Sequence, residues 1–302
     1  MKNNRNKSIA MTAILLLSFF FVTYCTHDMG DKGVIQKPDE TLEQYRVVGM
    51  LHNEVMADVL ADLQGNTEPF EDRSSAIRFM EESLTNSIAS KELMHNMDKG
   101  DIRKIVAGEL INAQSDDHLG NVNKAGHVMD RLSASAVENL TEQQWDILEE
   151  VDRIIETSEN GEEMISALER INSSDAVQKL DPEQRYVIYA ATSVGIESAE
   201  YWEQHYEEWV KALVGSDYAE YHKSLNADFF DEIQWFNGRS MVRADVGGAV
   251  GGAVAGCMGG AVVGGIGCGP GAAAGALGTS AGASATNAAK QLFDRIFDNG
   301  GS

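Results

Sequence analysis

Basic residues are scarce in this chain. Its 302 residues include 24 lysines and arginines against 47 aspartates and glutamates. Removing residues 1–24, which hold three bases and no acid, leaves 21 bases and 47 acids, a net charge of −26. A nucleic-acid partner needs a basic patch, and none is visible. We therefore predict a well-solvated acidic exterior and no nucleic-acid partner.

Proline and cysteine are also rare, with four prolines and three cysteines. Few prolines permit long helices. After Cys25 the cysteines are Cys257 and Cys268, which are 11 residues apart. On one continuous helix this separation is about 16 Å, too far for a disulfide. A bend near Gly264 would bring them together, but we predict two small apolar helix residues and no disulfide scaffold.

Recognisable catalytic and metal-binding motifs are missing. There is no His-Glu-x-x-His pair and no Gly-x-Ser-x-Gly elbow. His205 and Glu208 have ligand spacing but no third ligand one turn away. His118 and His127 lie among loop-type polar residues, which explains them better than a metal. We predict no enzyme, no cofactor and no metal.

Apolar spacing of three, four and seven predicts an all-α fold with a helical domain over residues 39–243. A first helix should end near Gly65. Thr141 with Gln144 forms a capping-box pattern, and Asp181 with Gln184 repeats it around a first-turn proline. The other helices are expected over 73–97, 101–114 and 122–138.

The helix after Asp181 is predicted to be central. It carries a seam of small residues suited to close helix packing: Val187, Ala190, Ala191, Val194 and Ser198. Aromatic residues flank the seam: Tyr186, Tyr189, Tyr201, Trp202, Tyr206 and Trp209. We interpret these aromatics as core packing, with a membrane-interface belt or a partner-binding face as the alternative.

A run of 44 residues, 246–289, has no charge and contains 15 glycines. Glycine costs a helix about 1 kcal/mol relative to alanine, so the run is not expected to fold alone. Five glycines recur at four-residue spacing, which places them on one helix face: Gly248, Gly252, Gly256, Gly260 and Gly264. Such a face allows two helix backbones to touch.

Gly269-Pro270-Gly271 divides this run, and Pro270 is the predicted turn. The arms before and after it are about 31 Å and 28 Å long as helices, close to the thickness of a bilayer core. Small residues of the second arm are expected to pack against the first arm: Gly271, Gly275, Gly278 and Gly282. We predict a membrane-associated helical hairpin over residues 246–298, with membrane lipid and a second copy of the chain as partners.

The N-terminus predicts export. Basic residues precede an apolar stretch over 9–22, so residues 1–24 are interpreted as a signal peptide. Val22-Thr23-Tyr24-Cys25 resembles a lipobox, which implies lipidation of Cys25, although Tyr24 departs from the pattern. Ordinary cleavage and an uncleaved anchor are the alternatives. Residues 25–38 are then a polar tether in front of the helical domain.

Three segments carry resemblances. The spaced glycines resemble the glycine zippers of bacterial envelope lipoproteins, and residues 247–283 resemble the membrane-active part of class II bacteriocins. Residues 186–195 and 198–202 are similar to exported lipoproteins of the Bacteroidetes type. These resemblances imply a lipid-anchored protein of the outer membrane or cell surface whose hairpin inserts or oligomerises at a membrane. The alternatives are a bacteriocin-like pore-forming toxin and a soluble helical binding protein with the hairpin packed intramolecularly.

Overall fold

The computed structural model describes residues 39–66, 70, 73–95, 97–114, 127–214, 227–262 and 268–298. Those residues form helices, and no strand occurs among them. The predicted all-α fold class is therefore confirmed. The signal peptide, Cys25 and the tether lie outside the described residues.

The elements follow one another with short connections where these are described. The α-helices are α2 (Asp39–Gly65), α3 (Arg73–Ser90), α4 (Lys99–Gln114), α5 (Ala134–Asn139), α6 (Glu142–Thr157), α7 (Gly161–Asn172), α8 (Asp175–Gln178), α9 (Pro182–Val214), α11 (Ala227–Val262) and α12 (Cys268–Asp298). Two 3-10 helices are η1 (Glu92–Met94) and η3 (Val128–Arg131).

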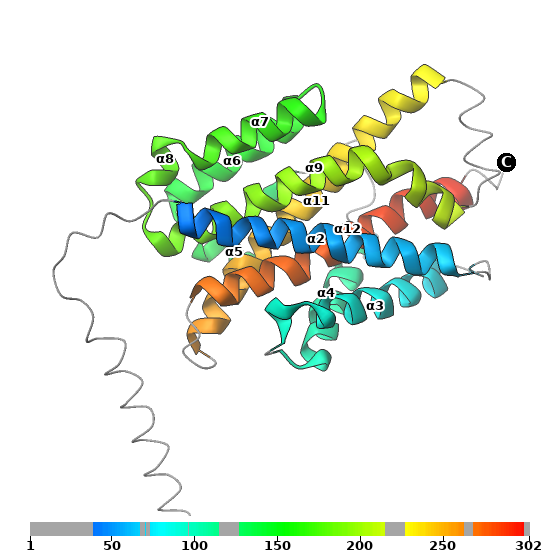
Figure 1. Cartoon of the computed structure of the whole chain (residues 1–302), viewed down its shortest axis with the longest axis horizontal. Helices are drawn as coiled ribbons and strands as arrows, with labels where there is room; N and C mark the ends of the chain where they lie inside the picture. Colours follow the sequence, from blue (N-terminus) through cyan, green and yellow to red (C-terminus); the bar gives the residue numbers. More distant parts are fainter. Residues whose placement is uncertain are drawn as a thin grey trace, which may run out of the picture. The chain divides into compact units, whose positions relative to one another are not determined.

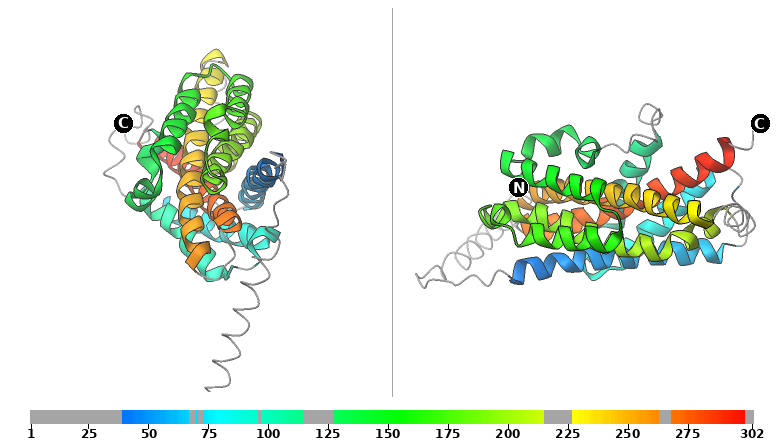
Figure 2. Two further views of the ribbon diagram at one scale, coloured as in Figure 1. Left: turned by 90° about the vertical axis from the view of Figure 1, so that its left-hand side faces the viewer. Right: turned by 90° about the horizontal axis from the view of Figure 1, so that it is seen from above.

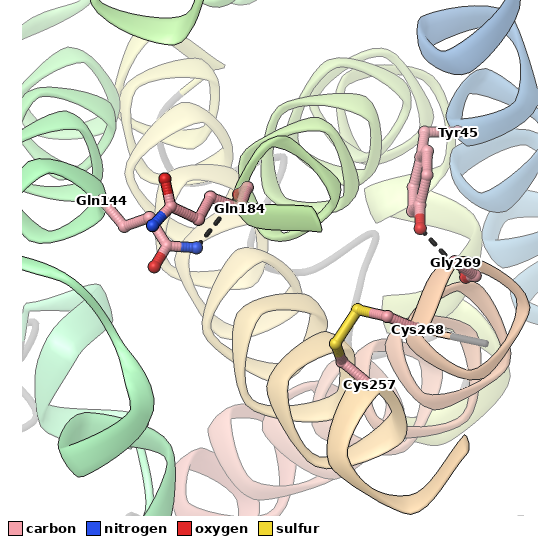
Figure 3. Close-up of a disulfide and its surroundings, with 6 residues drawn as sticks. All are labelled: Tyr45, Gln144, Gln184, Cys257, Cys268 and Gly269. Carbon is pink, nitrogen blue, oxygen red and sulfur yellow. Dashed lines mark hydrogen bonds between the residues drawn. A yellow bond between two sulfur atoms is a disulfide. The ribbon is translucent and has the colours of Figure 1, made fainter. Parts of the chain in front are cut away.

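Local capping explains where two helices begin. The Thr141 hydroxyl accepts the backbone N–H of Gln144, and the Gln144 side chain accepts the N–H of Thr141, so the predicted capping box is confirmed. At α9 the Asp181 N–H donates to the Gln184 side chain over 3.1 Å. Figure 3 shows that Gln144 also donates to the Gln184 carbonyl, over 3.0 Å, which ties the start of α6 to the start of α9.

Other predicted boundaries differ from the structure. The helix expected over 73–97 ends at Ser90, whose hydroxyl donates to the Ser87 carbonyl, and the short η1 follows. The helix expected over 122–138 is replaced, in its described part, by η3 and α5. The domain boundary expected between 243 and 246 falls inside α11. A single compact unit covers Asp39–Ser302.

Helix α9 lies at the centre, as predicted, and contacts α2, α6, α7, α8, α11 and α12. In Figure 1, α6 and α7 lie on one side of α9, while α3 and α4 lie beside α12 on the opposite side. The left view of Figure 2 shows the same order from a second direction. The long helices α11 and α12 are therefore covered by the body along much of their length.

The aromatic residues of α9 are core residues. Tyr189, Tyr201, Trp202, Tyr206 and Trp209 are all at most 4% exposed. The Trp209 indole donates to the Tyr201 hydroxyl over 2.9 Å, so a polar atom of this aromatic cluster is satisfied internally. The core-packing interpretation is confirmed for these five side chains, and Tyr186 is partly buried against the core, where its ring stacks on Tyr45.

Candidate functional site

The spaced glycines form a backbone-to-backbone contact between α11 and α12. A Cβ added at Gly248 would lie 2.7 Å from the Thr279 carbonyl oxygen, and one added at Gly252 or Gly256 would overlap the Gly275 or Gly271 carbonyl. No real side chain tolerates such distances, so any larger residue must push the helices apart. Successive glycines of α11, Gly248, Gly252 and Gly256, meet residues of α12 in reverse order, Thr279, Gly275 and Gly271, so the two helices are antiparallel.

The remaining predicted glycines are placed differently. Gly278 faces α4, where a Cβ would lie 3.3 Å from Ile105. Gly282 lies in the buried part of α12. Gly260 belongs to α11 without a described environment, and Gly264 lies outside the described residues. In the part that the structure describes, the contact consists of three glycines of α11 against a short part of α12. It is reinforced by the Thr279 hydroxyl, which donates to the Gly248 carbonyl over 2.5 Å.

The predicted turn residue lies elsewhere. Pro270 is in the first turn of α12, which begins at Cys268, so it belongs to the second helix and not to the connection between α11 and α12. The physical reason is that proline has no backbone N–H, and the N–H groups in the first turn of a helix are unpaired in any case. The fixed φ of proline also suits that turn. Gly269 next to it accepts a hydrogen bond at its carbonyl from the Tyr45 hydroxyl, over 3.0 Å (Figure 3).

Cys257 and Cys268 form a disulfide, contrary to our sequence prediction (Figure 3). The prediction treated the two residues as part of one continuous helix. In the structure they belong to two antiparallel helices, and their Cα atoms are 4.0 Å apart. The disulfide closes the end of the α11–α12 pair beside the glycine contact.

Asp245 is the last charged residue of α11 before the uncharged run. It is fully buried where α11 meets α2 and α9. Its Oδ2 atom accepts hydrogen bonds from Ser198 over 2.5 Å and from the Trp202 indole over 3.1 Å. His52 of α2 is also fully buried, with Nε2 3.6 Å from the same oxygen. That distance is too long for a hydrogen bond. The cluster joins three helices and has no access to solvent.

A second polar cluster lies two residues earlier on α11. The Arg243 guanidinium donates to the Asp152 carboxylate over 3.2 Å, and both side chains are 6% exposed. Asp152 also accepts the Val128 N–H over 2.9 Å and contacts His127 Nδ1 at 2.5 Å. The hydrogen bond to Asp152, followed by its charge, raises the pKa of His127. His127, which the sequence analysis places among loop-type polar residues, is therefore an ion-pair partner of Asp152.

A cleft of about 290 Å³ lies between α2, α7 and α9. Its lining combines charged, polar and apolar side chains: Leu42, Glu43, Arg46, Glu169, Asn172, Ser193, Ile196 and Glu197. Ser193 is 2% exposed, and its Oγ has no hydrogen-bond partner among the described residues. Burial, followed by the charge of Glu200, raises the pKa of Glu197.

Sequence reasoning missed this cleft because its residues come from three distant helices and no spacing pattern joins them. Among the described residues, those of the cleft included, no three His, Cys, Asp or Glu side chains converge to hold a metal ion. None of the described helices is long and apolar enough to cross a membrane. Comparison of the chain with protein-family models, curated proteins and solved structures found no match.

Proposed function

We propose that this protein is an exported helical binding protein, anchored to the cell envelope through Cys25, whose glycine-rich helices pack inside its own body. One observation carries this proposal: the side chains of the uncharged run that face the body are buried. Ala249, Val250 and Ala253 of α11 and Ala276 and Leu277 of α12 are all 0% exposed. Apolar surface that is already covered gains little from entering lipid.

The approach of α11 to α9 supports the same proposal. A Cβ at Gly195 would lie 3.0 Å from the Val246 side chain, so the small-residue seam of α9 receives the first residue of the run. The buried polar atoms of Asp245 add directional contacts at the same place. Separating α11 from the body would break the hydrogen bonds of the Asp245 carboxylate. It would also expose the apolar seam of α9.

The experiment is membrane fractionation of full-length wild type and the Cys25→Ser variant. The proposal expects wild type to partition with membranes and to incorporate labelled fatty acid. The variant should be released by carbonate and remain monomeric without detergent. A Cys25→Ser protein that resists carbonate extraction would show that the glycine-rich helices bind the membrane themselves.

A second candidate is a pore former that stores the same two helices in its body and releases them at a target membrane. The length of the uncharged run favours it, together with Met258 near the end of α11, which is 37% exposed. Dye release from liposomes by the Cys25→Ser protein tests this candidate. Release at low protein concentration would support the pore former, and intact liposomes would support the binding protein.

A further inference from the structure

The two cysteines of the disulfide differ in their access to solvent. Cys268 is 8% exposed, whereas Cys257 is only partly buried against the core. Beside Cys257 on α11, Ala255 and Met258 are exposed, and Pro270 is exposed at the start of α12. A thiolate that approaches from solvent therefore reaches the sulfur of Cys257 more easily than the sulfur of Cys268.

The two sulfurs also differ as leaving groups. Cys268 is the first residue of α12, a helix of 31 residues (Figure 3). The N–H groups in the first turn of a helix have no partner within it, and they stabilise a negative charge placed there. Cys257 lies inside α11, where the N–H groups are paired along the helix. Cys268 is therefore the better leaving group, because a thiol that ionises more easily leaves faster.

The segment that carries the disulfide lacks negative charge. From Val246 to Phe293 the chain contains no aspartate or glutamate, although the whole chain has 47 acidic residues against 24 basic residues. An acidic surface repels an anionic nucleophile, and this segment adds nothing to that repulsion. A thiolate is therefore less disfavoured beside this segment than beside the acidic parts of the protein.

Contacts other than the disulfide hold this end of the helix pair. The Tyr45 hydroxyl donates to the Gly269 carbonyl over 3.0 Å, and the Tyr45 ring stacks on Tyr186 with the ring centroids 5.5 Å apart. A Cβ at Gly269 would lie 3.4 Å from the Tyr186 ring, so the start of α12 packs against α9 as well. After reduction the two cysteines therefore stay close together, and the bond can form again without refolding of the protein.

We propose that Cys257–Cys268 is an exchangeable disulfide that accepts two electrons from a dithiol, a peptide or protein segment with two neighbouring thiols. One thiolate of the dithiol attacks the Cys257 sulfur, a mixed disulfide forms there, and Cys268 leaves as a thiolate. The second thiolate of the dithiol attacks the first sulfur of the dithiol and releases Cys257. The dithiol becomes a disulfide, and its two protons pass to the cysteines or to water. This redox role goes beyond the proposed binding role and does not depend on lipidation of Cys25.

The test is reduction of the folded full-length Cys25→Ser protein by dithiothreitol, followed by alkylation and mass spectrometry. An exchangeable bond should be reduced at a rate that is proportional to the dithiothreitol concentration and unchanged by low concentrations of denaturant. A bond that opens only on unfolding should be reduced faster as denaturant is added, in step with the unfolding equilibrium. That second result would overturn the inference.

Glutathione, a monothiol, identifies the sulfur that is attacked. In acid-quenched mixtures, fragmentation mass spectrometry should find glutathione on Cys257, and glutathione on Cys268 would contradict the proposed direction. Cys257→Ser retains the Cys268 thiol, and Cys268→Ser retains the Cys257 thiol. Alkylation of the first variant should reach half its maximal rate at a lower pH than alkylation of the second, because the start of α12 stabilises the thiolate. The opposite order would overturn the assignment of the leaving group.

A pair of charge variants tests where the thiolate approaches. Met258→Lys places a cation beside Cys257 and should speed the reaction with glutathione about twofold at moderate ionic strength. Ala61→Lys adds the same charge at an exposed position of α2, about 24 Å along that helix from Tyr45, and should leave the rate unchanged. Equal acceleration by both variants would show general attraction of the anion to the protein and would contradict attack at this end of the helix pair.

Discussion

The α9 core and the α11–α12 contact are packed in opposite ways. Around α9, large aromatic side chains such as Trp202 and Trp209 fill the space between helices. Between α11 and α12, side chains are absent where the backbones meet, as at Gly252 and Gly275. Removing atoms should therefore damage the first region, while adding atoms should damage the second. Both regions belong to one compact unit.

The largest expected effect comes from deleting a ring in the α9 core. Trp209→Ala should lower the free energy of unfolding by about 4 kcal/mol, because it leaves a cavity and an unpaired Tyr201 hydroxyl. Denaturant unfolding followed by circular dichroism measures this change. Trp145 is partly exposed on α6, and Trp145→Ala is the matched control, with an expected loss below about 1 kcal/mol. Equal losses of unfolding free energy in the two variants would contradict the claim that large buried side chains hold the α9 core together.

The next effect comes from adding one methyl group at the glycine contact. Gly252→Ala should destabilise the protein by about 3 kcal/mol, since the new Cβ overlaps the Gly275 carbonyl, which is backbone and cannot rotate away. The same denaturation experiment gives the value. An unchanged midpoint would mean that α11 and α12 do not meet here.

Reduction of the Cys257–Cys268 disulfide should cost roughly 2–3 kcal/mol, because the bond closes a short loop between the paired helices. The measurement is the thermal midpoint with and without reductant. A Cys257→Ser/Cys268→Ser protein should have the lower midpoint in both conditions. A reductant effect in that double variant would assign the loss to something other than this bond.

One position away from the critical glycine, the sign should reverse. A Cβ at Gly251 would meet only Leu132, at an ordinary 3.9 Å, so Gly251→Ala should stabilise the protein by about 1 kcal/mol through helix propensity. Comparing Gly251→Ala with Gly252→Ala in one denaturation series separates the effect of helix propensity from the effect of the α11–α12 contact. Destabilisation by both would indicate a tighter or different packing of α11.

The smallest expected effect is electrostatic. The pKa of His127 is raised in the folded state by the hydrogen bond to Asp152, so protonated His127 stabilises the fold. This contribution is present below the unfolded value near 6.5 and is lost as pH rises through the higher folded value. The side chain is largely exposed, so the change should be small. Histidine NMR titration should show the raised pKa return toward normal in Asp152→Asn.

Local features of the fold could be predicted from the sequence, whereas contacts between distant helices could not. The capping pattern at Thr141 fixed the start of α6, because both partners lie within one turn. Glycine spacing indicated a close helix face, but it did not identify the face of α12 that Gly278 presents to α4. The Cys257–Cys268 bond was missed because its prediction depended on where the chain turns.

The candidate sites show the same limit. Asp245 ends the charged part of α11, yet its partners Ser198 and His52 are 47 and 193 residues away in the chain. The cleft between α2, α7 and α9 depends on a close approach of α2 to α9 that Gly49 permits, and no sequence motif indicates it. Such sites become visible only when the packing of the helices is known.

Hydrogen exchange of the full-length Cys25→Ser protein in detergent-free buffer tests the central claim most directly. Packing of the glycine-rich helices inside the body predicts that the amides of 246–262 and 271–288 exchange as slowly as those of α9, and that liposomes leave them unchanged. Fast exchange in buffer, with protection only when liposomes are added, would contradict the account and assign these helices to the membrane.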